Sequence, residues 1–249
     1  MTLQDFFTKH PSVAVAFSGG CDSAYLLYQA SLYAKSVHAY YMNTAFQPAF
    51  ELEDAKRFCE QYQIPLTVLE MDLSENPEIL KNNSLRCYYC KHQIFSKILA
   101  AASKDYYTVL LDGTNASDDA ADRPGMRALA ELKVYSPLRL CNLTKSQIRE
   151  HSKKLGLFTH DKPAYACLAT RISTNTPIQL SDLKRVEACE QILASLGFTD
   201  FRVRIFHDAA RIQLPKKEFS QALELSPDIT HLFEPYFSTV LLDLTPRRD

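Results

Sequence analysis

A short segment, Ser-Gly-Gly-Cys-Asp-Ser at residues 18–23, constrains this chain more than any other feature. The apolar run at 13–17 is typical of a buried strand, and the residues at 24–30 are typical of a helix. Gly19 and Gly20 let the backbone turn sharply between them, and a helix N-terminus presents free N–H groups at the positive end of its dipole. The segment therefore predicts a phosphate-binding loop.

The side chains of the same segment also suit a nucleotide phosphate. Ser18 and Ser23 supply hydroxyl donors, and Asp22 has the chemistry to hold Mg²⁺ against phosphates. The segment matches neither G-x-x-x-x-G-K-[ST] nor G-x-G-x-x-G, so it provides no lysine for a transferring γ-phosphate. The alternative is an ordinary glycine turn, and we favour the phosphate loop because strand context, serines and aspartate coincide.

The segment resembles the S-G-G-x-D-S signature of the PP-loop ATP pyrophosphatases. In that family the loop grips the β,γ-pyrophosphate of ATP, so that an acceptor oxygen attacks the α-phosphorus and becomes adenylated. The resemblance implies that this chain binds ATP and Mg²⁺ through Ser18, Gly19, Gly20, Asp22 and Ser23.

Strand-like and helical segments alternate through the first two thirds of the chain. This alternation predicts an α/β fold with a parallel sheet and helices on both faces, the Rossmann-like architecture of a PP-loop domain. The expected strands are 13–17, 37–42, 66–71, 106–111 and 133–136, and the expected helices are 22–34, 50–62, 90–103, 126–132 and the capping-box helix 144–155.

A polar stretch at 172–177 is typical of a linker. After it, the alternation of strand-like and helical segments changes. We therefore expect a PP-loop domain at 1–172 and a small α+β domain at 178–249, which serves substrate binding or oligomerisation. Its expected elements are helices at 180–196 and 218–225 and strands at 201–206, 210–214 and 239–244.

Ligands of parallel sheets bind beyond the carboxyl ends of the strands. Residues 18–23, 42–44 and 112–115 all follow predicted strands, so we expect them to surround one nucleotide. Met42 and Gly113 are expected near the adenine, with Asn115 in the same site.

The charge balance limits the partners. The chain of 249 residues has a net charge of −1, so no global basic field draws it to nucleic acid or to a membrane. It contains no run of 18 apolar residues, and its first residues lack a basic and then apolar signal region. We expect a cytoplasmic protein that acts on a small molecule.

Three of the seven cysteines suggest metal or sulfur chemistry. Cys87 and Cys90 form a C-x-x-C at a helix start between Arg86 and Lys91, where the helix dipole and the basic neighbours favour thiolates. No second C-x-x-C or C-x-x-H is present, which argues against a closed zinc site. Cys167, in a stretch without periodicity, adds a third thiol, and three thiolates suit a [4Fe–4S] cluster with one open iron.

Other interpretations of these cysteines remain open: a redox C-x-x-C, or three small buried residues. We expect Cys59, Cys141 and Cys189 to belong to the core, and we expect no chemistry from Cys21, which fills the variable position of the phosphate loop.

Several further motifs carry a second resemblance. They are Asp-Gly-Thr-Asn-Ala-Ser-Asp-Asp at 112–119, Arg-Pro-Gly-Met-Arg-Ala at 123–128, Ser-Pro-Leu at 136–138, Leu-Thr-Lys at 143–145, Asp-Lys-Pro-Ala at 161–164, Ala-Cys-Leu at 166–168 and Arg-Val-Arg at 202–204. Together they resemble the LarE family, ATP-dependent sulfur transferases that build the nickel-pincer cofactor of lactate racemase. The resemblance implies adenylation of pyridinium-3,5-biscarboxylic acid mononucleotide, displacement of AMP by sulfur, and a homo-oligomer.

The sulfur source divides that family. In one branch a single cysteine, matching Cys167, gives up its own sulfur and becomes dehydroalanine. In another branch three cysteines hold a [4Fe–4S] cluster whose open iron carries a sulfide. Because this chain has Cys87 and Cys90 as well, it resembles the cluster branch.

Charged residues supply the remaining candidates. Arg202 and Arg204 alternate on a predicted strand and so point to one face, where two guanidinium groups suit a phosphate or carboxylates, although a solvated strand face is the alternative. Arg123 and Arg171 are weaker candidates for substrate contact. Glu187 and Glu190, three apart on a helix, can assist a metal as the family's helix acids do, or form a solvated acidic face.

Other functions compete with this one. A tRNA-thiolating PP-loop enzyme uses the same adenylation but needs a broad basic surface. An amide-forming PP-loop enzyme uses ammonia and has no need of paired cysteines. A nucleotide-binding regulatory module has no need of Asp22 to hold a leaving-group metal.

Overall fold

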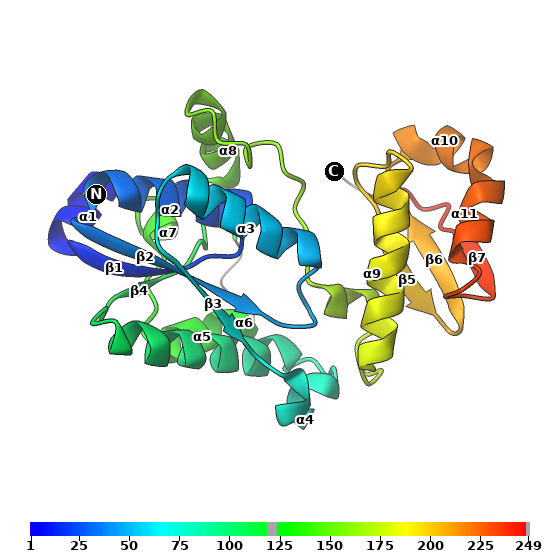
Figure 1. The fold of residues 1–249 in the computed structure, drawn as a ribbon, viewed down its shortest axis with the longest axis horizontal. Coiled ribbons are helices and arrows are strands. Elements are labelled where there is room, and N and C mark those ends of the chain that lie inside the picture. Colours follow the sequence, from blue (N-terminus) through cyan, green and yellow to red (C-terminus); the bar gives the residue numbers. More distant parts are fainter. Residues whose placement is uncertain (119–123, 248–249) are drawn as a thin grey trace. The chain divides into compact units, whose positions relative to one another are not determined.

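The computed structural model describes residues 1–118 and 124–247, which form two compact units (Figure 1). The first unit comprises Met1–Ile79 and Ser84–Tyr165, and the second comprises Leu80–Asn83 and Ala166–Asp249. The division thus falls before Ala166 rather than after residue 172, because the segment around Arg171 packs within the second unit.

A four-stranded parallel sheet forms the centre of the first unit, in the order β3-β2-β1-β4. The strands are β1 (Ser12–Ala16), β2 (Ser36–Asn43), β3 (Leu66–Glu70) and β4 (Leu110–Leu111). Val15 of the central strand β1 pairs with Ala39 on one side and Leu111 on the other, which fixes the register. Because all four strands are parallel, their carboxyl ends share one edge, and the predicted α/β class is confirmed.

Helices cover both faces of this sheet. Helices α2 (Cys21–Tyr33) and α3 (Ala49–Gln61) lie on one face and α5 (Arg86–Lys104) lies on the other (Figure 1). The further helices before residue 166 are α1 (Leu3–Lys9), η1 (Leu73–Glu75), α4 (Pro77–Leu80), α6 (Pro124–Glu131), α7 (Pro137–Leu140) and α8 (Lys145–Lys154). The predicted capping box is confirmed: Thr144 and Gln147 bond reciprocally at the start of α8.

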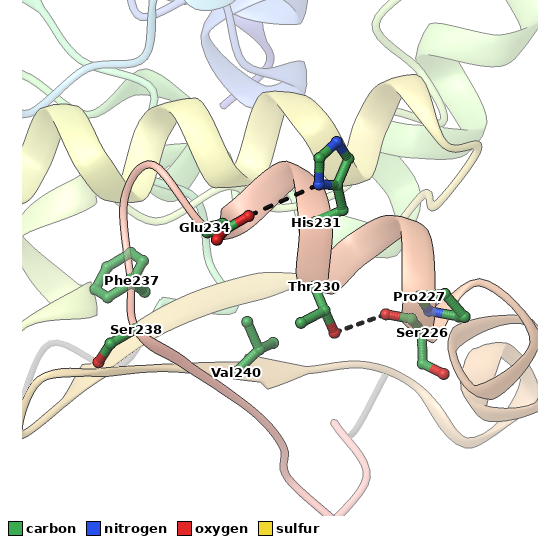
Figure 2. A pocket seen from close by; sticks show the side chains of 8 residues that line it. All are labelled: Ser226, Pro227, Thr230, His231, Glu234, Phe237, Ser238 and Val240. Carbon is green, nitrogen blue, oxygen red and sulfur yellow. Dashed lines mark hydrogen bonds and ion pairs between the residues drawn. The ribbon is translucent and has the colours of Figure 1, made fainter.

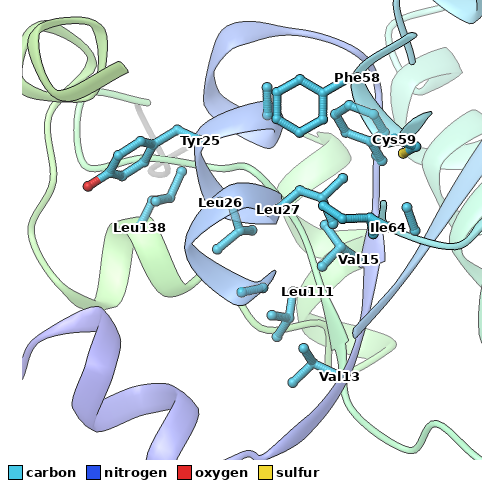
Figure 3. Packing of buried hydrophobic residues seen from close by; sticks show 14 of the residues in the cluster. Val13, Val15, Tyr25, Leu26, Leu27, Phe58, Cys59, Ile64, Leu111 and Leu138 are labelled. Carbon is cyan, nitrogen blue, oxygen red and sulfur yellow. The ribbon is translucent and has the colours of Figure 1, made fainter. Parts of the chain in front are cut away.

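The main core lies between the sheet and α2 and α3 (Figure 3). Val13 and Val15 of β1, Leu26 and Leu27 of α2, and Phe58 of α3 are all completely buried there. Burial of side chains of this kind stabilises a fold by about 1.5–3 kcal/mol each. This packing fixes β1 against α2 and so holds the loop that connects them.

The second unit is a small α+β module. Its strands β5 (Arg202–Phe206), β6 (Ala209–Gln213) and β7 (Thr239–Leu242) form one sheet, in which β5–β6 is antiparallel and β6–β7 parallel. Helix α9 (Leu180–Ser195) packs against β5 and buries Leu183, Val186, Cys189 and Leu193. The remaining elements are η2 (Leu168–Arg171), η3 (Lys216–Glu218), α10 (Phe219–Glu224) and α11 (Ser226–Phe233).

Two predicted strands were largely wrong. The strand expected at 106–111 is reduced to Leu110–Leu111, because α5 runs to Lys104 and Tyr106 turns out of it at φ +64°. The strand expected at 133–136 is a single bridge between Tyr135 and Leu111, since Lys133 also adopts a positive φ, +53°.

Four α-helices of the described residues were not predicted: α1, α4, α7 and α11. Helix α1 begins at a capping box between Thr2 and Asp5 and buries Leu3, Phe6 and Phe7.

Across the residues that the structure describes, no helix is both long enough and apolar enough to traverse a lipid bilayer.

Candidate functional site

The predicted phosphate loop connects β1 to α2, and its geometry requires a glycine at position 19. Gly19 has φ +71°, and a Cβ at this position would lie 2.8 Å from the carbonyl oxygen of Glu51. Gly20 is the N-cap of α2 and its carbonyl accepts a hydrogen bond of 2.9 Å from the Ala24 N–H. The first N–H groups of α2 have no partners within the helix, so this turn presents donors to an anion.

The two serines close the loop on itself. The Ser18 and Ser23 hydroxyl oxygens lie 3.0 Å apart, and the Ser23 hydroxyl donates to the Gly20 carbonyl at 3.2 Å. The structure therefore brings both predicted hydroxyls together, at the point where the strand ends and the helix begins.

Asp22 is the acidic group of the site and lies in the first turn of α2. Its Oδ2 accepts hydrogen bonds from Asn115 Nδ2 and from Lys145 Nζ, both at 3.3 Å. Its Oδ1 is buried and has no hydrogen-bond partner among the residues that the structure describes. A carboxylate oxygen left in this state fits a cation ligand, so the residues present suit the predicted Mg²⁺.

A second loop, after β4, supports the first. Buried Asp112 accepts hydrogen bonds from the hydroxyls of Thr114 and Ser136, which hold the turn in place. The next residue, Gly113, approaches α2 so closely that a Cβ would lie 2.9 Å from the Ser23 amide nitrogen. Only glycine allows these two loops to pack against each other.

Asn115 joins this loop to Asp22. It is buried, its N–H donates to Asp118 Oδ2 at 2.9 Å, and its Oδ1 accepts from the Ser117 N–H at 2.8 Å. These contacts orient its amide toward Asp22, and a role for Asn115 in nucleotide binding stays a prediction.

Met42 lies near the carboxyl end of β2 and is buried, and Thr44 follows the strand. The Thr44 hydroxyl accepts from the Phe46 N–H and donates to Gln47 Oε1, which orders the turn. The turns after β1, β2 and β4 therefore lie at one edge of the sheet, and the adenine contact of Met42 and Gly113 stays a prediction.

Cys87 and Cys90 are the second and fifth residues of α5, near the helix start as predicted. Cys87 is exposed, Cys90 is half-buried, and Arg86 Nη2 donates to Cys87 Sγ at 3.5 Å. Thiols near a helix start beside a guanidinium have the chemistry of iron–sulfur ligands.

Cys167, half-buried, is the N-cap of η2 and belongs to the second unit. Over residues 1–118 and 124–247, no three His, Cys, Asp or Glu side chains gather into a group that could hold a metal ion. The three-cysteine cluster stays a prediction.

The other four cysteines divide by burial. Cys59 and Cys189 are buried in the core, where burial raises the pKa of each thiol to about 12. Burial also raises the pKa of Cys21, which lies near the Ser152 hydroxyl. Cys141 was expected in the core and is only half-buried.

The predicted arginines of β5 lie in a cationic cluster of the second unit. Arg202 is 5% exposed, so the solvated-face alternative is wrong for it; burial, with the nearby Arg171 and Arg247, lowers its pKa to about 10. Burial and Arg171 likewise lower the pKa of Arg204, whose guanidinium donates to the Thr170 carbonyl and to Gln213 Oε1.

Arg171 and Glu190 form a buried ion pair. Arg171 Nε donates to Glu190 Oε1 at 2.6 Å and Arg171 Nη2 to Glu190 Oε2 at 3.0 Å, while Oε1 also accepts from the Val203 N–H at 2.8 Å. Glu190 is 3% exposed and so does not form a solvated acidic face. The pair ties η2, α9 and β5 together, and both its members are engaged in structure.

Two further candidates are Glu187 and Arg123. Glu187 lies on α9 and is half-buried. Arg123 lies outside the described residues. For both, the role in substrate or metal binding stays a prediction.

A groove of about 580 Å³ lies on the second unit beside α11 and β7 (Figure 2). The residues that line it are Ser226, Pro227, Thr230, His231, Glu234, Phe237, Ser238 and Val240. None of the residues predicted from the sequence lines this groove, so it is separate from the candidate site.

Comparison with known proteins gives two kinds of match. The family model of the queuosine biosynthesis protein QueC matches residues 12–87, which include the phosphate loop. An uncharacterized protein from Synechocystis sp. is 32% identical over 225 residues, covering 89% of this chain and 83% of the relative. An uncharacterized protein from Methanocaldococcus jannaschii is 30% identical over 237 residues, covering 95% and 90%.

A third relative has an assigned activity. The pyridinium-3,5-bisthiocarboxylic acid mononucleotide synthase of Lactiplantibacillus plantarum is 29% identical over 235 residues, covering 93% of this chain and 85% of the relative. The chain belongs to the LarE family. As a LarE-family protein it is an ATP-using enzyme of the PP-loop type, and the loop between β1 and α2 lies within the residues that the QueC family model matches.

The candidate site also contains contacts that the sequence did not predict. Lys145 pairs with Asp22, and Asp112 anchors the turn at Gly113. Both lie within motifs that carried the family resemblance. The capping box at Thr144 was the available signal for Lys145, because it fixes that lysine at the first position of α8.

Proposed function

We propose that the protein is an ATP-dependent sulfur transferase that converts the carboxylates of pyridinium-3,5-biscarboxylic acid mononucleotide into thiocarboxylates, for the nickel-pincer cofactor of lactate racemase. The observation that carries this proposal is the loop at 18–23, with Gly19 in a left-handed conformation and one buried oxygen of Asp22 unpartnered within the described part of the chain. The L. plantarum relative, named for the bisthiocarboxylic product, supports the choice of substrate.

The first step is adenylation. A carboxylate oxygen of the substrate attacks the α-phosphorus of ATP, the bond from that phosphorus to the bridging oxygen breaks, and pyrophosphate leaves with the electron pair. The N–H groups at the start of α2 bind the departing pyrophosphate, and Asp22 would hold a Mg²⁺ ion, which would supply positive charge to neutralise it. Lys145, 3.3 Å from Asp22, adds a positive charge at the same edge.

The second step is sulfur transfer. A sulfur nucleophile attacks the carbonyl carbon of the acyl-adenylate, the bond to the AMP oxygen breaks, and AMP leaves with a thiocarboxylate formed and no net redox change. A [4Fe–4S] cluster held by Cys87, Cys90 and Cys167 would supply this sulfur. In the alternative, Cys167 attacks with its own thiolate, and β-elimination then leaves the thiocarboxylate and dehydroalanine. A second round treats the other carboxylate.

The substrate is a small anionic mononucleotide, and the arginines of β5 suit it. Arg202 and Arg204 retain their charge at neutral pH, since even the lowered pKa of Arg202 is about 10. We propose that they bind the phosphate or carboxylates of the substrate, with Arg123 assisting, in a homo-oligomeric protein.

The reaction products test the adenylation step. The purified protein is incubated with ATP, Mg²⁺ and the biscarboxylate, and the nucleotides are separated. We expect AMP and pyrophosphate in equal amounts, with release dependent on the biscarboxylate. Release of ADP contradicts the proposal, because it places the attack on the γ-phosphorus.

The sulfur source is tested separately. Protein purified without oxygen is expected to be brown, with iron and acid-labile sulfide, and Cys87→Ala, Cys90→Ala and Cys167→Ala are each expected to lose the colour. A colourless wild-type protein whose mass falls by the elements of H₂S during turnover supports the loss of sulfur from Cys167 instead.

A further inference from the structure

Lys162 contacts the backbone of the phosphate loop at Gly19. Its Nζ donates to the Gly19 carbonyl oxygen at 3.1 Å and to Asp54 Oδ2 at 2.6 Å. The lysine side chain is 16% exposed, so these bonds are largely shielded from water. Lys162 belongs to the Asp-Lys-Pro-Ala motif at 161–164, to which the reaction above assigns no role.

The contact with the Gly19 carbonyl determines where the next N–H points. The peptide between Gly19 and Gly20 is trans, so its C=O and its N–H point in opposite directions. Lys162 holds the carbonyl at the back of the loop, and the Gly20 N–H is therefore directed to the other side, with the N–H groups at the start of α2. Because glycine has little conformational preference of its own, an external contact is needed to fix this peptide.

Lys162 is itself held firmly from two helices. Arg149 of α8 donates to the Lys162 carbonyl at 2.7 Å and to the His160 carbonyl at 3.1 Å. Asp54 and Phe50 of α3 contact the ammonium group, with the Phe50 ring centroid 5.3 Å away. The donor that faces Gly19 thus has a fixed position.

We propose that Lys162 is a positioning residue of the phosphate loop, which keeps the Gly19–Gly20 peptide oriented to bind the pyrophosphate part of ATP. The inference rests on the proposed function for its ligand. It makes a selective prediction: Lys162 matters for ligands that carry the pyrophosphate group and not for AMP, which lacks it.

Binding of three ligands to Lys162→Met tests the proposal. Isothermal titration calorimetry measures the affinities of Lys162→Met and of the wild type for ATP, inorganic pyrophosphate and AMP. We expect the affinities for ATP and pyrophosphate to fall about tenfold or more, the scale of one charge-assisted hydrogen bond, and the affinity for AMP to change less than about twofold. Lys162→Arg, which keeps a cationic donor, is expected to restore most of the ATP affinity.

A matched control separates this effect from the loss of any lysine–carboxylate pair. Lys154 pairs with Glu150 at the same 2.6 Å but lies exposed on α8. Lys154→Met is expected to bind all three ligands like the wild type. If Lys162→Met does not fold, Asp54→Asn serves instead, because it removes the partner that orients the ammonium, and the same selective loss is expected.

Two results would overturn the inference. One is unchanged pyrophosphate affinity in Lys162→Met and Asp54→Asn. The other is an equal loss for AMP, which indicates general damage to the site. Failure of the proposed function has a different signature: the wild type binds ATP and pyrophosphate, the Lys162 variant loses both selectively, and the wild type nevertheless releases ADP.

Discussion

Gly19 lies against the backbone of Glu51, so that a Cβ at position 19 would be 2.8 Å from the Glu51 carbonyl oxygen. That oxygen belongs to the first turn of α3, which packs behind the phosphate loop. Together with φ +71° at Gly19, this approach excludes every side chain from the position. The shape of the loop therefore depends on two constraints, the positive φ of Gly19 and the close approach of Glu51. Substitutions can distinguish their effects.

Gly19→Ala is expected to abolish tight ATP binding. The left-handed conformation costs about 1–2 kcal/mol for a residue with a Cβ, and the clash with Glu51 forces the backbone to move in addition. Gly156 has a similar φ of +68°, but a Cβ there would meet no atom within 4 Å, so Gly156→Ala carries the conformational cost alone. Titration with ATP should show loss in the first variant and wild-type affinity in the second. Equal binding by both would show that the loop does not need its present shape.

Asp22→Asn is expected to slow pyrophosphate release by about a hundredfold or more at saturating Mg²⁺, because a metal that neutralises phosphate charge contributes several kcal/mol to the transition state. The amide keeps the size of the side chain but removes its negative charge. That charge pairs with Lys145 through Oδ2 and is shared by the buried Oδ1. Asp182→Asn is the control, since Asp182 pairs with Arg185 on α9, in the second unit. A rate within twofold of the wild type in Asp22→Asn would remove this residue from the reaction.

The sequence predicted the parts of the site that depend on neighbours in the chain. The strand, loop and helix around 18–23 follow from local patterning, and the capping box at Thr144 correctly gave the start of α8. Such signals are local because helix and strand periods and caps involve residues only a few positions apart.

Contacts between distant residues could not be predicted in this way. Lys162 donates to Gly19 across 143 positions of the sequence, and Arg171 pairs with Glu190 of α9. The motif around Lys162 and the arginine at 171 were visible, but a side chain's partner depends on the packing of elements, which composition and spacing do not encode. For the same reason Arg171 was expected to contact substrate, whereas its guanidinium is engaged by Glu190.

The Arg171–Glu190 pair gives a prediction about stability. Arg171→Met leaves the buried Glu190 carboxylate without its cation, which is expected to lower the free energy of unfolding by about 3–5 kcal/mol. Adding Glu190→Gln should recover part of this loss, because the neutral amide oxygen can still accept from the Val203 N–H. Urea unfolding measures both variants. A double variant that is less stable than Arg171→Met would contradict this account of the pair.

The buried thiols give a prediction about alkaline pH. Burial raises the pKa of Cys59 and Cys189 to about 12 from an ordinary value of 9.0, so the folded protein keeps both protons where the unfolded chain has begun to lose them. Unfolding then releases protons, and stability must fall as the pH rises from 9 toward 12. We expect the urea midpoint to decline over this range, and to decline less steeply in Cys59→Ala/Cys189→Ala.

The same difference in burial predicts which thiols react. At pH values just below the ordinary thiol pKa, iodoacetamide should alkylate exposed Cys87 in the folded apoprotein, while Cys59 and Cys189 should react only after denaturant is added. Peptide mass spectrometry assigns the labelled positions. Equal slopes of stability against pH in the wild type and the double variant, together with labelling of Cys59 in the folded protein, would mean that these thiols are open to water and that the core around α3 is looser than its packing indicates.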